Sequence, residues 1–169
     1  MRFASTLLPF LYATFSTSTI IPSFASSSQT TLDKPVFPVP GKNPLRFCTD
    51  PKHYILNITN VDLSPNPPVP GSTLNITASG IFSKNVDPGA TLFLQVKYGL
   101  ITLIRQEADM CDRIGNVDLT CPLKKGEMDL TKSVEIPKQV PKGTYSVIAD
   151  VKSVDGEAVT CMMSEVMFS

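Results

Sequence analysis

The sequence is poor in the residues from which catalytic and nucleic-acid-binding sites are usually built. It has no Trp and a single His, His53, among 169 residues. One imidazole excludes any metal site that needs two or more His ligands, and a Ser/His/Asp arrangement would have to use this one. Lys+Arg and Asp+Glu both number 15, without a basic block, so the positive surface needed for nucleic acid is missing. We expect no nucleic-acid partner and rank an enzyme behind a binding protein.

The remaining candidates for chemistry are also weak. No C-x-x-C pattern occurs, so zinc and thiol-redox sites are not expected. The acidic stretch at residues 107–112 lacks the spacing of a calcium loop. Lys124 and Lys125, near Arg105 and Arg113, could attract an anionic headgroup, but solvated surface lysines are the simpler interpretation. We expect no catalytic residue, no metal and no cofactor.

The first 25 residues have the pattern of a secretory signal peptide. Arg2 precedes an apolar stretch at residues 7–13, and the small residues Ser23 and Ala25 stand at the −3 and −1 positions of a cleavage site. A membrane anchor is the alternative, but spanning needs about 20 mostly apolar residues. Prolines and hydroxyl residues interrupt this run, and no later segment could span a bilayer.

The rest of the chain divides into a short leader and one domain. Residues 26–45 are rich in Ser and Thr and then in Pro, which predicts a propeptide or flexible linker. The folded domain is expected at residues 46–169. Two N-x-T sequons, at Asn57 and Asn75, are glycan acceptors in a eukaryotic secretory pathway. We expect the product to be secreted or kept in a vacuole lumen.

Four cysteines follow the leader, an even number in an oxidising route, so two disulfides are expected. Three pairings are open. We favour Cys111–Cys121, which closes the short polar loop between them, together with Cys48–Cys161, which ties the two ends of the domain. On the chain-entropy model each bridge contributes roughly 3 to 5 kcal/mol.

The domain resembles a series of strands separated by turns, and helical periodicity is not evident. Between Ile58 and Val61 the apolar residues change phase, as in a bulged strand, and Gly99 is a plausible kink or strand junction. Strands are expected at residues 54–64, 72–82, 92–100, 101–105, 116–121, 127–136, 144–153 and 158–168. Seven to eight strands with one apolar face argue for an antiparallel β-sandwich.

The alternation marks the inward faces of this sandwich but does not say what fills them. A packed core and a cavity produce the same alternation. Two features slightly favour free space over a packed core: Trp is absent, and some of the residues on these faces are small. The inner-face candidates are Leu74, Ile76, Ala78, Phe82, Leu92, Leu94, Val96, Tyr98, Leu100, Val134, Ile136, Tyr145, Val147, Ala149 and Val151.

Several of these features together resemble one family. They are the run at residues 58–65, the Pro-rich break before residues 71–77, and the two cysteine pairs. From about Phe47 to Phe168 the chain is similar to the ML lipid-recognition family, in particular to fungal phosphatidylglycerol/phosphatidylinositol transfer proteins, relatives of the Niemann-Pick type C sterol carrier. No cysteine lies between Cys48 and Cys111, where the sterol-carrying animal relatives have a third disulfide, so sterol specificity carries over less well than the fold.

The resemblance implies an immunoglobulin-like sandwich whose sheets part to admit lipid, with no catalysis and no cofactor. The inner-face candidates then become candidates for a lipid cavity. The expected partners are phosphatidylinositol and phosphatidylglycerol, with a sterol as a second candidate, and the protein is expected to be a monomer that contacts membranes transiently. An intraluminal sterol carrier is one alternative. The other is a secreted immunoglobulin-like interaction module with a solid core.

Overall fold

The structure, a computed structural model, describes residues 36–114 and 119–169. The expected signal peptide at residues 1–25, and residues 26–35 of the expected leader, lie outside this part of the chain. The elements are β1 (Phe37–Pro38), β2 (Arg46–Phe47), the 3-10 turn η1 (Pro51–His53), β3 (Leu56–Ser64), β4 (Thr73–Phe82), β5 (Thr91–Tyr98), β6 (Ile101–Asp109), α1 (Met110–Ile114), β7 (Gly126–Glu135), β8 (Gly143–Lys152) and β9 (Ala158–Phe168).

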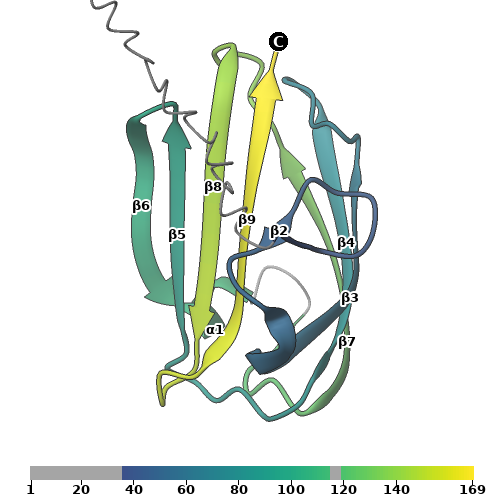
Figure 1. The fold of residues 1–169 in the computed structure, drawn as a ribbon, viewed down its shortest axis with the longest axis vertical. Coiled ribbons are helices and arrows are strands. Elements are labelled where there is room, and N and C mark those ends of the chain that lie inside the picture. Colours follow the sequence, from purple (N-terminus) through teal and green to yellow (C-terminus); the bar gives the residue numbers. More distant parts are fainter. Residues whose placement is uncertain (1–35, 115–118) are drawn as a thin grey trace, which may run out of the picture. The chain divides into compact units, whose positions relative to one another are not determined.

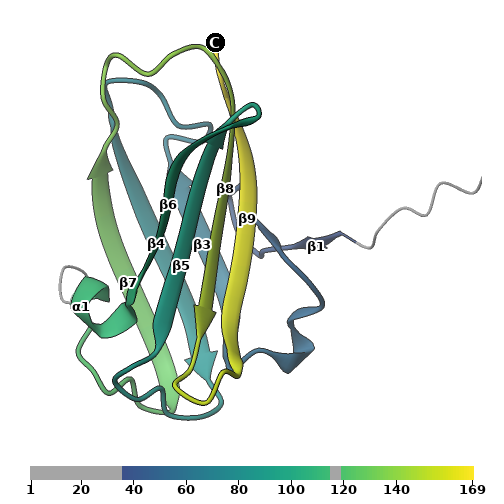
Figure 2. The same ribbon diagram turned by 90° about the vertical axis from the view of Figure 1, so that its left-hand side faces the viewer.

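The strands form two antiparallel layers, which confirms the expected β-sandwich. One sheet has the order β1-β2-β9-β8-β5-β6 and the other the order β3-β4-β7. Figures 1 and 2 show the two layers side by side, with the C-terminal end of β9 at the top. We call this end the upper end; it carries the loops at residues 65–72, 99–100 and 136–142. The lower end carries the loops at residues 83–90 and 153–157 and helix α1.

The three-stranded sheet follows the polar and apolar alternation of its sequence. In β4, Thr73, Asn75 and Thr77 are exposed, whereas Leu74 and Ile76 on the other face are half-buried. This period of two places one apolar row against the second sheet. In β3 the register against β4 shifts between Ile58 and Asn60, which confirms the expected bulge and keeps both Ile58 and Val61 buried.

Two local expectations need correction. The strand expected at residues 116–121 is absent from its described part, residues 119–121; residues 116–118 lie outside the described chain. The sequence showed no helical period, yet Met110–Ile114 form α1, which is too short for a period to be seen. Gly99 fits its expected role, because its positive φ of 54° lets the chain turn from β5 into β6.

The most tightly packed side chains lie at the lower end. Val86 and Ala90 from the loop before β5 are fully buried, and Phe82, at the end of β4, and Val159, at the start of β9, are nearly so. Both disulfides, Cys48–Cys161 and Cys111–Cys121, also lie in the lower half of the sandwich. The structure therefore has the pairing favoured from the sequence. Cys48–Cys161 joins the segment after β2 to β9 within the large sheet, and Cys111–Cys121 joins α1 to the segment before β7.

Residues 39–45 were expected within a propeptide or linker, but they are part of the fold. We call them the strap. The strap connects β1 to β2 and lies beside β3: the Val61 amide donates to the Pro40 carbonyl at 2.8 Å, and the Leu63 amide donates to the Lys42 carbonyl at 3.0 Å. Val39 is buried in the core. A Pro-rich segment resembles a linker in composition, and its long-range hydrogen bonds leave no local sequence signal.

Within the described residues, no helix has the length and apolar character to cross a bilayer.

Candidate functional site

An apolar cavity of about 390 Å³ lies between the two sheets. One wall comes from β3, β4 and β7, the other from β8 and β9, and the strap and the loop after β3 close part of its rim. Its lining is Pro44, Leu45, Leu56, Ile58, Val61, Leu63, Pro68, Leu74, Ile76, Ala78, Ser79, Met128, Leu130, Val147, Met162, Ser164 and Val166. A space of this size is incompatible with native packing density throughout the interior, so the solid-core alternative is not what the structure shows.

The cavity has almost no polar group to offer a guest. Ser164 is buried, and its hydroxyl donates to the Pro44 carbonyl at 3.4 Å, a long hydrogen bond within the wall. The other walls consist mainly of aliphatic side chains and methionines, and methionine adapts its shape to irregular guests. Such a site can hold a flexible hydrocarbon, and it has no charged side chain in its lining.

The strap seals the cavity along the edge where β3 faces β9. Asn43 organises it: its side-chain amide donates to the Val61 carbonyl at 2.7 Å, and its Oδ1 accepts from the Leu45 amide at 2.8 Å. These hydrogen bonds hold Pro44 and Leu45 in position in the cavity lining. The Asp62 carboxylate accepts hydrogen bonds from the Lys42 amide and the Asn60 side chain, which lower its pKa.

An aromatic cluster lies on the inner face of the large sheet at the upper end. The ring centroids of Tyr98 and Tyr145 are 5.1 Å apart, and those of Tyr145 and Phe168 are 5.3 Å apart. The Tyr98 hydroxyl donates to the Lys142 carbonyl at 2.9 Å and the Tyr145 hydroxyl to the Pro141 carbonyl at 3.0 Å. Burial, with the nearby Tyr98, raises the pKa of Tyr145. The cluster thus fixes the loop at residues 136–142 above the inner face.

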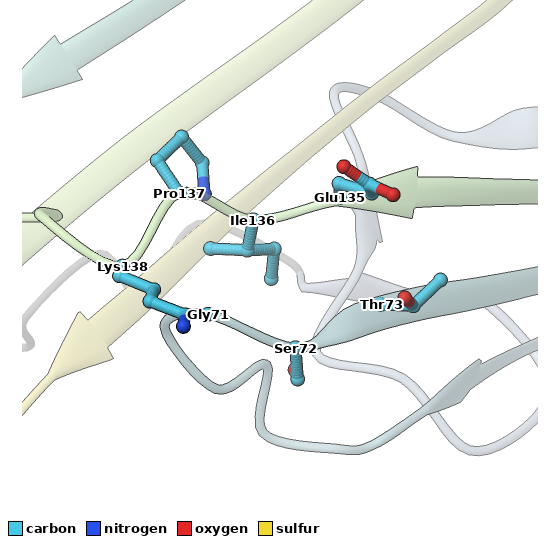
Figure 3. Close-up of a pocket in the computed structure, with 7 residues that line it drawn as sticks. All are labelled: Gly71, Ser72, Thr73, Glu135, Ile136, Pro137 and Lys138. Atoms are coloured by element: carbon cyan, nitrogen blue, oxygen red, sulfur yellow. The ribbon is translucent and has the colours of Figure 1, made fainter.

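A separate, polar hollow of about 420 Å³ opens at the upper end (Figure 3). There the loop before β4 and the chain after β7 run side by side, because the Gly71 amide donates to the Ile136 carbonyl and the Ile136 amide to the Ser72 carbonyl, both at 3.0 Å. The Lys138 side chain extends beside Gly71, with Glu135 nearby. This hollow offers hydroxyl and charged groups where the cavity offers hydrocarbon.

The structure brings together four of the fifteen inner-face candidates in the cavity wall: Leu74, Ile76, Ala78 and Val147. Seven others lie on the inner face of the large sheet but outside the lining: Leu92, Leu94, Val96, Tyr98, Tyr145, Ala149 and Val151. Alternation identifies the face of a strand, but it does not tell which part of that face borders free space, and here the space lies under β8 and β9.

Four candidates lie elsewhere, and their placement as cavity residues needs correction. Phe82 is buried in the lower core. Ile136 lines the polar hollow instead. Leu100 is fully exposed because it occupies the β5–β6 turn rather than a strand. Val134 is on the inner face of β7, opposite Leu74, but it is exposed near the upper end of the strand and does not line the cavity.

Most of the lining was missed from the sequence. The inner residues of β3 were recognised as strand residues but not as cavity candidates, although the phase change at the bulge marks them. Met162, Ser164 and Val166 of β9 alternate inward as well. Pro44 and Leu45 had no such signal, because only the fold brings the strap to the cavity.

The other residues considered from the sequence do not form a reactive site. His53 is exposed in η1, and the Asp109 carboxylate caps α1 by accepting from the Cys111 amide at 2.7 Å. Across residues 36–114 and 119–169, no group of three or more His, Cys, Asp or Glu could hold a metal ion. Lys124 and Lys125 are exposed at the lower end.

Asn57 and Asn75 are both exposed on the outer face of the three-stranded sheet, where an attached glycan would project into solvent. The two disulfides indicate that the chain folds in an oxidising compartment.

Comparison with known proteins agrees with this architecture. A family model described as ML domain matches residues 42–168. The chain is 51% identical over 164 residues to a phosphatidylglycerol/phosphatidylinositol transfer protein of Aspergillus oryzae, covering 96% of this chain and 94% of the relative. A protein of the same name from Aspergillus fumigatus is 55% identical over 140 residues, covering 83% of this chain and 80% of the relative.

A solved structure shares the fold at low sequence identity. It is chicken MD-1 complexed with lipid IVa, with a TM-score of 0.54 and 17% identity, covering 80% of this chain and 99% of that one. The match of the family model over most of the described chain, the high identity to the curated relatives and the common sandwich lead to one conclusion: this chain belongs to the ML domain family.

Proposed function

We propose that this protein is a non-enzymatic lipid carrier that binds phosphatidylglycerol and phosphatidylinositol and exchanges them between membranes. The observation that carries the proposal is the apolar cavity between the sheets. The names of the Aspergillus relatives supply the two phospholipids. The protein would act as a monomer, secreted or in a vacuole lumen, with Asn57 and Asn75 glycosylated and the mature chain beginning after Ala25.

The volume of the cavity sets how a phospholipid would fit. A methylene group fills about as much space as a water molecule, about 30 Å³, so about 390 Å³ holds about 13 methylenes. This is most of one acyl chain and too little for two. The sheets therefore have to part to admit a diacyl lipid, and the upper half of the sandwich, which lacks both disulfides, is where they can do so.

The energetics favour exchange over permanent storage. Removing about 13 methylenes from water is worth about 10 kcal/mol at about 0.8 kcal/mol each, so a phospholipid leaves a bilayer for water only rarely. Cavity and bilayer are similarly apolar, so transfer between them is close to isoenergetic. A protein with such a cavity removes the aqueous barrier without changing the final distribution of the lipid.

Transfer between vesicles tests the proposal. Donor vesicles carrying fluorescent phosphatidylglycerol or phosphatidylinositol are mixed with unlabelled acceptors, with and without the purified protein, and a labelled sterol is run in parallel. We expect the protein to accelerate movement of both phospholipids. If both labels stay in the donor and solvent extraction of the purified protein yields no phospholipid by mass spectrometry, the proposal is wrong; movement of the sterol alone would favour the sterol carrier.

A further inference from the structure

Among the described residues, five of the ten large apolar side chains that the fold leaves exposed lie at the upper end of the sandwich, and Leu103 and Ile104 continue this row down β6. Leu100, at the tip of the β5–β6 turn, has a relative exposure of 101%, and Ile101 beside it has 62%. Val69 in the loop after β3, Val134 near the end of β7 and Met167 near the end of β9 are also exposed. Figure 1 shows that these segments lie at the same end of the sandwich as the C-terminus, spread across the width of the two sheets.

The charged side chains in the loops of the upper end are all positive. The loops at residues 65–72, 99–100 and 136–142 contain two lysines, Lys138 and Lys142, and no acidic residue. The acidic group beside them is Glu135, at the end of β7. Apolar tips next to lysines match the chemistry of a bilayer surface with anionic headgroups, where hydrocarbon lies beneath negative charge.

The lower end has a different character. Its loops mix acidic and basic residues, and one pair, Lys84 and Glu157, forms an ion pair with Nζ and Oε1 2.6 Å apart. Both disulfides lie in this half. The outer face of the three-stranded sheet, which carries the two sequons, is polar, with Thr59, Thr77 and Thr131 exposed. Neither surface combines exposed apolar residues with unopposed positive charge.

The cavity extends to the upper end as well. Leu63 and Leu74 line it at the end of β3 and the start of β4, and Pro68, in the loop between them, closes it. A lipid that leaves the cavity upwards therefore passes the loop at residues 65–72, which carries the exposed Val69; the β5–β6 turn with Leu100 lies at the same end, at the edge of the large sheet.

We propose that the upper end is the membrane-docking surface of this protein, and that it seats on a bilayer of anionic phospholipid with Leu100 and Ile101 inserted and Lys138 and Lys142 at the headgroups. The proposal rests on the proposed lipid-carrier function and adds to it the place and orientation of membrane contact. Insertion of Leu100 strengthens partitioning about tenfold or more, and each lysine near an anionic surface adds about fivefold.

The absence of Trp from the chain allows a direct test. Leu100→Trp places one fluorophore at the upper tip, and Val154→Trp places one in the loop at residues 153–157, where Val154 is 60% exposed at the lower end. Both variants replace one exposed apolar residue by another. We expect the emission of Leu100→Trp to move to shorter wavelength on vesicles of phosphatidylcholine with phosphatidylglycerol, and that of Val154→Trp to stay unchanged.

Charge neutralisation gives a second, independent readout. The double variant Lys138→Gln/Lys142→Gln should bind these vesicles about 25-fold more weakly, at about fivefold per lysine. The matched control, Lys124→Gln/Lys125→Gln at the lower end, should bind as the unmodified chain does. A loss confined to the control pair, or a shift confined to Val154→Trp, would place docking at the lower end and overturn the proposal.

Lipid capture separates this proposal from the proposed function. Fluorescent phosphatidylglycerol is presented from detergent rather than from vesicles, so that loading of the cavity needs no docking. We expect Lys138→Gln/Lys142→Gln to capture this lipid normally and to transfer it slowly between vesicles. Normal capture and transfer by this variant, with unweakened vesicle binding, would refute docking and leave the carrier function standing. A shift of Leu100→Trp emission with protein concentration alone would show a second copy on this surface and would also refute it.

Discussion

A larger side chain in the cavity wall should strongly weaken lipid capture without unfolding the domain. Ala78 is the smallest side chain in the lining, and it lies on β4 opposite Leu130 of β7 in the register. In Ala78→Phe the added ring takes the place of about four methylenes of a guest chain, each worth about 0.8 kcal/mol when buried. The loss is about 3 kcal/mol, so capture of phosphatidylglycerol should weaken about 100-fold.

The same substitution should leave the stability of the empty protein nearly unchanged. A ring added to a well-packed core costs typically 1–3 kcal/mol through strain, but a ring that enters free apolar space gains contacts. Thermal unfolding of the lipid-free protein measures the change in stability, and titration with fluorescent phosphatidylglycerol measures the affinity for lipid.

Ala149→Phe is the matched control. Ala149 lies on the inner face of β8, between Leu94 and Met162 in the register, and it does not line the cavity. We expect this variant to lose about 1–3 kcal/mol of stability and its folded fraction to keep most of its lipid capture. If Ala78→Phe loses stability as Ala149→Phe does and still captures lipid with full affinity, the space beside Ala78 is not where the guest binds.

Three further predictions test the parts of the fold that support the cavity. Asn43→Ala removes the hydrogen bonds that hold the strap and should lower the free energy of unfolding by about 1–3 kcal/mol in a denaturant titration; an unchanged midpoint would show that the strap does not close the edge. The Thr160 hydroxyl is buried without a partner in the described structure, so Thr160→Val should stabilise the domain by about 1 kcal/mol or leave it unchanged, and a clear loss of stability would contradict this. Hydrogen bonds lower the pKa of Asp62 in the fold, so its contribution to stability is present above the ordinary carboxyl range and is lost as pH falls through the lowered pKa. In Asp62→Asn the free energy of unfolding should therefore fall less steeply with decreasing pH than in the unmodified chain. An equally steep fall in both proteins would contradict this.

The sandwich could be predicted because its strands have one apolar face each. β4 is the clearest case: Thr73, Asn75 and Thr77 alternate with the residues that turn inward, and period two fixes the face without any knowledge of the partner strand. The bulge at Ile58 could be seen for the same reason, since a phase change in the apolar pattern is its direct consequence.

The cavity could be located only in part, because it depends on which strands face each other. Val147 and Ala149 are two residues apart on the same face of β8, yet only Val147 lines the space. Sequence alternation treats them alike. The strap was missed for a second reason: Pro44 and Leu45 reach the cavity through hydrogen bonds to β3 that join residues about 20 positions apart in the chain, as from Asn43 to Val61.

Photo-crosslinking from a group within the acyl chain of the bound lipid tests most directly whether the space between the sheets is the binding site. Phosphatidylglycerol with a diazirine near the middle of one acyl chain is loaded, activated by light, and the modified residues are identified by peptide mass spectrometry. The account predicts adducts on lining residues from both sheets, such as Ile76, Val147 and Met162. Adducts confined to exposed residues of β6, with none on either inner wall, would contradict it.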